Sequence, residues 1–382
     1  MGFTNTRGSA MWLGVFAGLL GWLGGCNFSM PEPPPDVFSR YNTLKVGWGP
    51  VFLAHGDFNR DGNADLVVAN SKDHSLSFLF GKGDGTFQPA QDLKVPVEPS
   101  FIVVTDLNHD ENPDLIFNSE GNQTFQVLLG KGQGTFQPMW SVPTGPVPLA
   151  LIVGDFNADG HKDVAVTLTF SKVEIHFGNG DGGFKRGETY ETGSRSISGV
   201  AGDFNDDGHE DLLLAVQSSN SSSIRFFSGN SGGTLRLTGR FAEDLRCLTL
   251  LKEDMNGDGL YDLVATSAKG DNLYYIPMGT NGKFGRPVSF SGGGGPISLA
   301  VGDFDGDHHK DVVVANSRSS SFSLITRHPN GAFRFPVRDY VTGSTPLAIV
   351  STDFNNDGLS DVAVASNTEG TVDIFLGRRV MK

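Results

Sequence analysis

A nine-residue segment rich in aspartate occurs seven times along the chain, and it offers the clearest chemistry in the sequence. Its first, fifth and ninth positions are Asp in every copy, and its third position is Asn in six copies and Asp305 in the other. The copies begin at Asp57, Asp106, Asp155, Asp203, Asp254, Asp303 and Asp353. Carboxylate, amide and main-chain carbonyl oxygens at alternate positions are the ligands that Ca²⁺ prefers. The segment therefore predicts a calcium loop.

Each loop is expected to supply side-chain oxygens from positions one, three, five and nine, and a main-chain carbonyl from position seven, where the residue type varies. The predicted ligands of the first four loops are Asp57, Asn59, Asp61, Asn63 and Asp65; Asp106, Asn108, Asp110 and Asp114; Asp155, Asn157, Asp159, His161 and Asp163; and Asp203, Asn205, Asp207, His209 and Asp211. Those of the last three loops are Asp254, Asn256, Asp258, Leu260 and Asp262; Asp303, Asp305, Asp307, His309 and Asp311; and Asp353, Asn355, Asp357, Leu359 and Asp361. The expected cofactor is calcium, up to about seven ions.

A tight turn in which Asp and Asn cap their own backbone is the alternative interpretation of these loops. It accounts for one or two acids in each loop but not for three, because three carboxylates within nine residues repel one another unless a cation neutralises them.

Two of the seven copies depart from the pattern. Loop two has Glu111 at position six, where glycine is usual, and Pro113 at position eight, so a left-handed backbone with a charged side chain and a compromised metal site are expected there. Loop six has His308 at the glycine position, but Asp305 adds a carboxylate, so this loop is expected to bind.

The elements that position the loops repeat with the same spacing, 48 to 51 residues. An apolar run such as Leu149 to Val153 leads into each loop, and another such as Val164 to Val166 leaves it. A third β-rich run, a glycine turn and a fourth extended segment complete the unit. Four strands per unit at this period predict an all-β, seven-bladed β-propeller with four strands per blade. An open β-solenoid is the alternative.

The two ends of the repeat array complete each other. The seventh unit stops at Gly377 after its third strand, and a segment resembling a fourth strand, Phe38 to Gly47, precedes the first unit. We therefore expect the N-terminal strand to close the last blade, which removes two exposed sheet edges. The expected propeller spans 37–378, with blades at about 48–96, 97–145, 146–193, 194–243, 244–292, 293–343, and 344–378 plus 37–47.

The first residues of the chain have the pattern of an export signal. The apolar run from Ala10 to Gly25 follows Arg7 and is short for a membrane span, which favours a signal peptide over residues 1–25. The run ends in Leu23-Gly24-Gly25-Cys26, which resembles the bacterial lipobox and implies that Cys26 is lipidated. A plain secretory signal is the alternative. With a proline-rich tether over 26–36, the protein is expected to be anchored by lipid in the bacterial cell envelope, facing the periplasm or the cell surface.

Charge and cysteine content exclude some classes of function. The chain has 43 acidic and 29 basic residues, a net charge of −14, and 22 of the acids are predicted calcium ligands. It therefore lacks the basic field that a nucleic-acid-binding protein needs. Cys247 is the only cysteine besides Cys26, so Cys247 is expected to be a small buried side chain without a disulfide partner. The histidines lack a zinc-site spacing, and those in the loops are expected to be solvated.

The motifs also carry a family resemblance. Asp-Phe-Asn-x-Asp-Gly-x-x-Asp at a period near 50, with Phe-Leu-Phe-Gly-Lys-Gly-Asp-Gly-Thr-Phe in the first unit, resembles the FG-GAP/VCBS repeat family, which includes the integrin α-subunit propeller. The resemblance covers about Phe38 to Gly377. It implies seven blades with Ca²⁺ in the loops between first and second strands, and it implies little about the ligand.

The face opposite the calcium loops is the candidate functional face, because Asn, Ser and an aromatic residue there suit a polar or sugar-like ligand; plain solvated loops are the alternative. Its predicted loops are rich in Asn and Ser, and Trp48 lies in a connecting segment; the loops are Asn70 to His74, Asn118 to Asn122, Ser218 to Ser223, Asn316 to Ser321 and Ser366 to Glu369. We expect a monomeric, non-catalytic scaffold that recognises a protein or a glycan. The alternative is a carbohydrate-active enzyme similar to polysaccharide lyases, which convergent Lys, Arg, His or Tyr side chains in a central funnel would favour.

Overall fold

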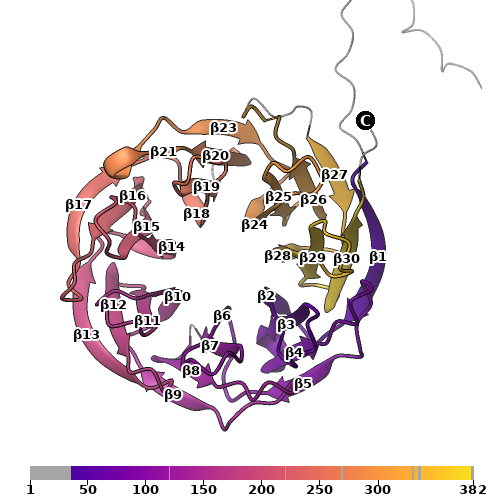
Figure 1. The fold of residues 1–382 in the computed structure, drawn as a ribbon, viewed down its shortest axis with the longest axis horizontal. Helices are drawn as coiled ribbons and strands as arrows, with labels where there is room; N and C mark the ends of the chain where they lie inside the picture. The colour runs from indigo at the N-terminus through magenta and orange to yellow at the C-terminus, as the bar shows by residue number, and fades with distance from the viewer. Residues whose placement is uncertain are drawn as a thin grey trace, which may run out of the picture. The chain divides into compact units, whose positions relative to one another are not determined.

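The computed structural model describes residues 36–119, 121–219, 221–267, 270–328, 331–333 and 337–379. Within these residues the regular structure is all-β apart from two short 3-10 turns, η1 (Ser71–Asp73) and η2 (Thr280–Gly282). Seven four-stranded antiparallel sheets are arranged as the blades of a ring (Figure 1). The expected class, a seven-bladed β-propeller with four strands per blade, is confirmed.

Blades one to six run outward from the centre of the ring in chain order (Figure 1). Blade one contains β2 (Pro50–Gly56), β3 (Asp65–Asn70), β4 (Ser75–Leu79) and β5 (Gln91–Lys94); blade two contains β6 (Phe101–Thr105), β7 (Asp114–Asn118), β8 (Thr124–Leu128) and β9 (Trp140–Pro143). Blade three contains β10 (Pro148–Gly154), β11 (Asp163–Leu168), β12 (Lys172–Gly178) and β13 (Phe184–Glu191); blade four contains β14 (Arg195–Gly202), β15 (Asp211–Gln217), β16 (Ser222–Ser228) and β17 (Arg236–Phe241).

Blades five and six follow the same order, whereas the outermost strand of blade seven comes from the start of the propeller. Blade five contains β18 (Cys247–Glu253), β19 (Asp262–Ser267), β20 (Asn272–Ile276) and β23 (Val288–Ser291), with a small hairpin of β21 (Met278–Gly279) and β22 (Lys283–Phe284) before its last strand. Blade six contains β24 (Pro296–Gly302), β25 (Asp311–Asn316), β26 (Ser321–Ile325) and β27 (Arg338–Val341). Blade seven contains β28 (Pro346–Thr352), β29 (Asp361–Ser366), β30 (Thr371–Gly377) and β1 (Phe38–Lys45). All strands lie within the blade ranges expected from the sequence.

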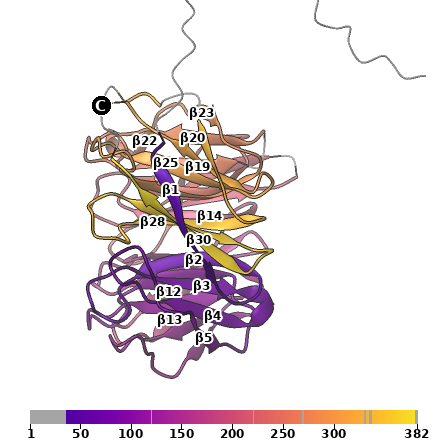
Figure 2. The same ribbon diagram turned by 90° about the vertical axis from the view of Figure 1, so that its right-hand side faces the viewer.

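The N-terminal strand β1 forms the outer edge of blade seven. It pairs antiparallel with β30, from Phe38 opposite Gly377 to Lys45 opposite Thr371. Figure 2 shows β1 crossing the side of the ring next to β30. The strand ends at Lys45, two residues before the expected end, and the Gly47 N–H instead donates to Ser77 Oγ in blade one at 3.2 Å. First and last segments of the propeller therefore share one sheet.

Neighbouring blades pack face to face, which buries the second strand of each blade on both sides. In β3, Leu66 and Val68 join a cluster with side chains of blade seven, whereas Val67 and Ala69 join a cluster with side chains of blade two. Successive side chains of a strand point to opposite faces, so a strand between two neighbours needs a continuous apolar run rather than alternation.

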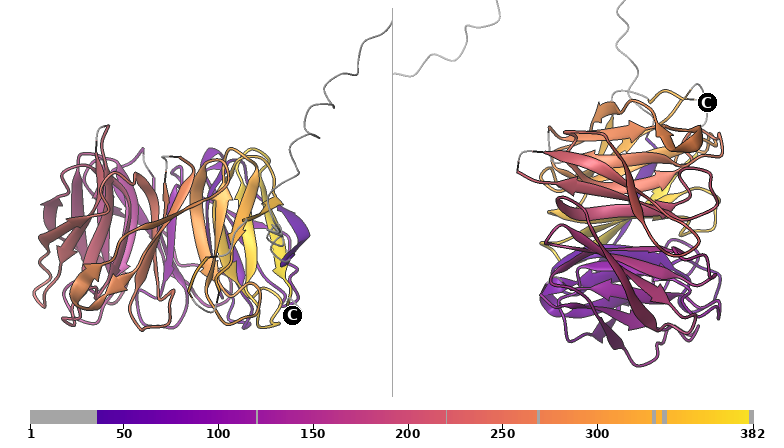
Figure 3. Two further views of the ribbon diagram at one scale, coloured as in Figure 1. Left: turned by 90° about the horizontal axis from the view of Figure 1, so that it is seen from above. Right: turned by 90° about the vertical axis from the view of Figure 1, so that its left-hand side faces the viewer.

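The strands run from one face of the ring to the other, so the connecting loops gather at two faces (Figure 3). The acidic loops join first to second strands and share one face. The apolar residue at position two of each loop is at most 3% exposed and packs into the core; these residues are Phe58, Leu107, Phe156, Phe204, Met255, Phe304 and Phe354. Each acidic loop is thus fixed to the core by its own side chain.

Two expectations about the cysteines have different outcomes. Cys247 is buried, is a free thiol, and has its pKa raised to about 12 by burial, as expected of a packed side chain. Cys26, residues 1–25, where a signal peptide is expected, and most of the expected tether lie outside the described residues. Among the residues that are described, no helix has the length and apolar character needed to span a bilayer.

Candidate metal centres

The seven acidic loops share one hydrogen-bonding pattern. In loop one, the Gly62 N–H donates to Asp57 at 2.9 Å, and the Asn63 N–H donates to Asp61 at 2.9 Å. The same two bonds, from positions six and seven to positions one and five, occur in all seven loops. The loop backbone therefore holds the carboxylates of positions one and five in fixed places before any ion binds.

Two positions in every loop adopt the left-handed backbone conformation. Position six does so in all copies, as the glycine pattern predicted, with φ of +84° at Gly62. Position four also does so in all copies, including Arg60, His109 and Ala158 at φ of +58° to +60°. Sequence reasoning missed position four. The only signal was that four of its seven residues are Gly, Asn or Asp, the types that tolerate this conformation best.

The aspartate at position nine is fully buried in all seven loops and fastens each loop to its blade. In loop one, Asp65 accepts the Phe58 N–H at 2.9 Å and the Gly81 N–H, from the end of the third strand, at 2.8 Å. The bond from the third-strand end recurs in all seven blades. A carboxylate offers about four lone-pair sites, so these two bonds leave acceptor capacity for a cation.

Burial makes these position-nine carboxylates difficult to ionise. It raises the pKa of Asp65, Asp114 and Asp163 to about 6, and the carboxylates of positions one and five in the same loop add to the shift. Burial also raises the pKa of Asp361 to about 7 and that of Asp311 to about 8. A bound cation stabilises the ionised form of carboxylates that are crowded together and shielded from water. The residues present therefore fit Ca²⁺.

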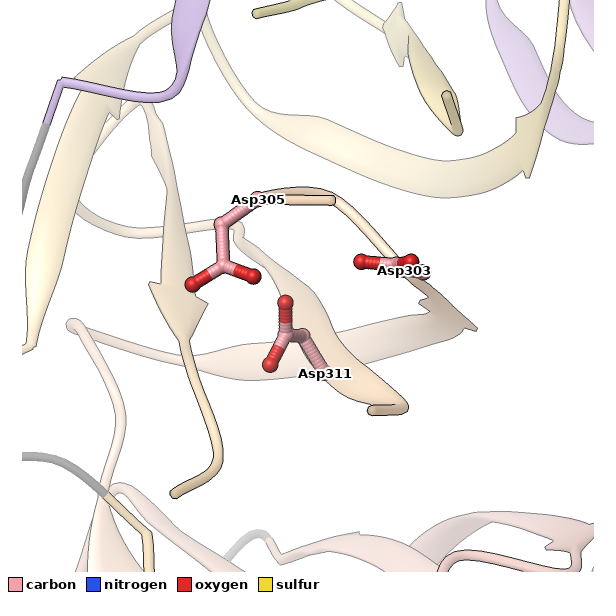
Figure 4. A group of neighbouring side chains, drawn as sticks. All are labelled: Asp303, Asp305 and Asp311. Carbon is pink, nitrogen blue, oxygen red and sulfur yellow. The ribbon is translucent and has the colours of Figure 1, made fainter. Parts of the chain in front are cut away.

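Loop six brings its acids closest together. The carboxylates of Asp303, Asp305 and Asp311 offer oxygens that all lie within 4.8 Å of one another, and Figure 4 shows them converging from the loop and the start of β25. In loops one, two, three and seven the Asn amide at position three instead donates to the position-five aspartate; in loop one Asn59 Nδ2 lies 3.0 Å from Asp61 Oδ2. The Asp305 substitution removes that donor and adds a charge.

Loop two keeps the common conformation in spite of its departures. Glu111 adopts φ of +62°, as expected, and its N–H still donates to Asp106 at 2.9 Å. Asp114 accepts the Leu107 and Gly130 N–H groups at 2.8 and 2.7 Å. A left-handed non-glycine residue costs roughly 1–2 kcal/mol. Weaker metal binding by this loop stays a prediction.

The loop histidines do not all behave as expected. The His308 side chain is 96% exposed, in agreement with a solvated group. His161, His209 and His309 are half-buried. His161 also contacts His109 of the preceding loop, with 3.2 Å between ring nitrogens.

The opposite face differs from the expected set of polar loops. Asn70, Asn118, Asn316 and Ser366 are fully buried at the ends of second strands, so their side chains serve the blades and are not displayed to a ligand. Asparagine is common in exposed turns, but these asparagines are buried and form hydrogen bonds within the blade. Asn70 Nδ2, for example, donates to Ser77 Oγ at 2.7 Å.

Two aromatic side chains on that face are exposed, Trp48 in the segment before β2 and Phe170 in the loop between β11 and β12, which is 65% exposed. Trp48 has a basic neighbour. It is 55% exposed, and the Lys72 ammonium lies 5.8 Å from the centroid of its ring. Its position at the junction of blades one and seven is fixed by the loop of blade seven, in which Asn367 Nδ2 donates to the Pro50 carbonyl at 3.0 Å. An exposed indole on a fixed backbone is a stacking surface.

The innermost strands carry three basic side chains, His55 of β2, Arg195 of β14 and Lys252 of β18. Lys252 of β18 donates to the Ala201 carbonyl of β14, and its ammonium lies 4.7 Å from the Tyr261 ring centroid. This Lys–Tyr pair is the kind of feature that would favour an enzyme. Its ammonium is already held by a carbonyl and a ring of the protein itself.

A known family of repeats matches the acidic loops and the strands around them. A family model described as an FG-GAP-like repeat matches residues 57–117, 106–166, 155–214, 254–314 and 304–364, and each match begins at position one or two of an acidic loop. No curated protein matches the chain significantly.

Solved structures share the fold at low sequence identity. BBS1N in complex with ARL6DN has a TM-score of 0.65 and 12% identity, covering 91% of this chain and 98% of that chain. Raptor of Chaetomium thermophilum has a TM-score of 0.59 and 12% identity, covering 90% of this chain and 29% of that one. An Agrocybe aegerita lectin specific for non-reducing terminal N-acetylglucosamine has a TM-score of 0.53 and 17% identity, covering 84% and 87%. These likenesses concern the fold alone.

Proposed function

Because this chain belongs to the FG-GAP-like repeat family, we propose that it is a calcium-stabilised, membrane-anchored propeller that recognises a glycan or a protein without catalysing a reaction. The observation that carries the proposal is that the two faces of the ring differ in their side chains. On one face, the aspartates of the acidic loops accept hydrogen bonds from their own backbone N–H groups and concentrate negative charge that a cation can neutralise. The other face displays Trp48 beside Lys72.

Calcium would be held by oxygens at the positions set out above: side chains at one, three, five and nine, and the main-chain carbonyl at seven. When bound, the ion supplies positive charge that offsets the crowded carboxylates. The chain's own part is to keep those carboxylates in place through the position-six and position-seven N–H groups and to fasten position nine to the third strand. The ion's role is therefore structural.

The proposed ligand is a glycan or a protein. The fold is shared with a lectin that recognises N-acetylglucosamine and with a propeller solved in complex with a protein, so both ligand classes are compatible with it. Trp48 favours a ligand with an apolar ring face, and Lys72 supplies a neighbouring hydrogen-bond donor.

Replacing Trp48 with Ala is expected to weaken ligand binding by more than about tenfold, because exposed aromatic anchors supply much of the binding energy at such surfaces. The measurement is a glycan array and a pull-down with the calcium-loaded protein, followed by calorimetry on the hit. Tyr261→Ala, which removes an aromatic side chain that is 44% exposed and belongs to loop five on the other face, is the matched control. Equal loss in both variants would place the ligand elsewhere.

Anchoring is proposed to occur through lipid on Cys26, and the propeller would then face the periplasm or the cell surface of a bacterium. Cys26→Ser is expected to move the protein from the detergent phase to the aqueous phase, because the proline-rich tether offers no second apolar anchor. Detergent partitioning and mass measurement of the mature N-terminus provide the test. An unchanged membrane fraction would refute the lipobox.

A further inference from the structure

In three of the seven pairs of neighbouring loops, the side chain at position four of one acidic loop contacts the side chain at position seven of the next. Arg60 Nη1 of loop one lies 3.5 Å from Asn112 Oδ1 of loop two. Asn356 Nδ2 of loop seven lies 3.0 Å from Asn63 Oδ1 of loop one. The left-handed backbone at position four projects these side chains toward the neighbouring blade. The contact is thus a property of the loop geometry, and the residue types decide its chemistry.

Between loops two and three the same two positions hold histidines. We propose that His109 and His161 form a binding site for a divalent transition-metal ion, with Cu²⁺ bound most tightly. Their Nε2 and Nδ1 atoms lie 3.2 Å apart, with ring centroids 5.4 Å apart and planes inclined by 49°. Two imidazole nitrogens that share one ion at about 2.0–2.1 Å each are separated by roughly 3 Å, so the two nitrogens already lie at the separation that binding of one ion requires.

The chemistry of imidazole selects the class of ion. Neutral imidazole is a good ligand for Cu²⁺, Ni²⁺ and Zn²⁺, and affinity for such sites rises to Cu²⁺ along the divalent series. Ca²⁺ prefers oxygen ligands and is not a competitor for the ring nitrogens. Water would complete the coordination, because the two rings supply two positions.

Each ring can present a lone pair without losing a proton. In the metal-free state the two nitrogens can share one N–H···N hydrogen bond, with one ring as donor. On binding, the donor ring shifts its proton to its other nitrogen, so both rings stay neutral and both facing nitrogens coordinate. Asp110, the residue after His109, and Asp159, two residues before His161, contribute to a negative field that raises the local concentration of cations.

The site is accessible and bridges two blades. His109 is exposed, His161 is half-buried, and they belong to loops anchored by buried aspartates in separate sheets. An ion bound here would tie blade two to blade three. His161 keeps its main-chain carbonyl for the calcium loop while its side chain serves the second ion, so the two metals do not compete for one atom.

The chain provides its own control variant. The double substitution His109→Asn and His161→Asn recreates the amide pair found at the same positions between loops seven and one. Asn tolerates the left-handed conformation of position four, and the main-chain carbonyl of position seven is unchanged. The double variant can therefore keep the hydrogen bond between blades while losing both nitrogen ligands.

The test is a titration of Cu²⁺ alone into the full chain in excess calcium, followed by calorimetry and by electron paramagnetic resonance. We expect one Cu²⁺ per chain with two coordinated nitrogens, and at least a tenfold weaker affinity in the double Asn variant and in His109→Ala. A melting midpoint of the double variant near that of the parent protein in calcium shows that the fold is retained. Equal affinity and equal nitrogen coupling in parent and double variant would overturn the proposal, whatever the outcome of the calcium measurements.

Discussion

Chelation of calcium is expected to lower the melting midpoint of the propeller by more than about 10 °C. A ligand that binds only the native state adds RT ln(1 + [L]/Kd) at each site, or about 2.7 kcal/mol at a hundredfold excess over Kd. Several calcium-filled loops contribute together. For a domain of this size, each kcal/mol of unfolding free energy shifts the melting midpoint by roughly 2–4 °C or somewhat less. The shift is large because every loop fastens its own blade through a buried aspartate such as Asp65.

The measurement compares thermal melting with calcium and with a chelator, and metal counting by mass spectrometry gives the number of ions. Asp159→Ala is expected to lose one calcium and to destabilise blade three. The same change at Asp110 should have the smaller effect, because Glu111 already strains loop two. Equal melting midpoints with and without calcium would remove the metal assignment for all loops, whereas a larger loss from the Asp110 change would reverse only the ranking of loops.

Repetition within one chain explains why so much of the loop could be predicted from sequence. Positions one, five and nine hold Asp in every copy, since carboxylates there receive specific backbone N–H groups or lie buried. The left-handed conformation of position four could not be predicted, because this position requires a backbone conformation and not a particular side chain, so its residue type varies. Arg60 and Ala158 adopt the same left-handed backbone as Gly257, at a modest energetic cost that the rest of the loop outweighs.

The opposite face was harder to predict because composition cannot separate a displayed polar side chain from a buried one. Asn70 and Asn316 lie in turn-like sequence, yet both are fully buried at strand ends and donate to serines of the next strand. Only the packing of neighbouring blades decides this. Trp48 remained exposed, and an apolar residue that stays exposed carries more information about a surface than a polar one.

Closure of the ring by β1 is expected to make Phe38 one of the most sensitive residues of the protein, although it lies near the start of the fold. Its ring is 2% exposed and packs edge-on against Phe304, Phe322 and Tyr340, at centroid distances of 5.2 to 5.5 Å. The Tyr340 hydroxyl accepts the Val37 N–H at 3.0 Å. These contacts join β1 to blade six as well as to its own sheet.

Phe38→Ala should therefore cost about 3–5 kcal/mol in the free energy of unfolding, the usual cost of truncating a buried Phe. Tyr41→Ala is the matched control in the same strand: Tyr41 is 48% exposed and lies at the bulge between Arg40 and Asn42, outside the regular pairing with β30, so its loss should change stability by less than about 1 kcal/mol. Urea unfolding in saturating calcium measures both. A Phe38 variant as stable as the Tyr41 variant would mean that β1 does not close the ring in solution. A selective loss at Phe38 would mean that the seventh blade depends on residues more than 300 positions away in sequence, since the Val37 N–H and the Tyr340 hydroxyl are 303 residues apart.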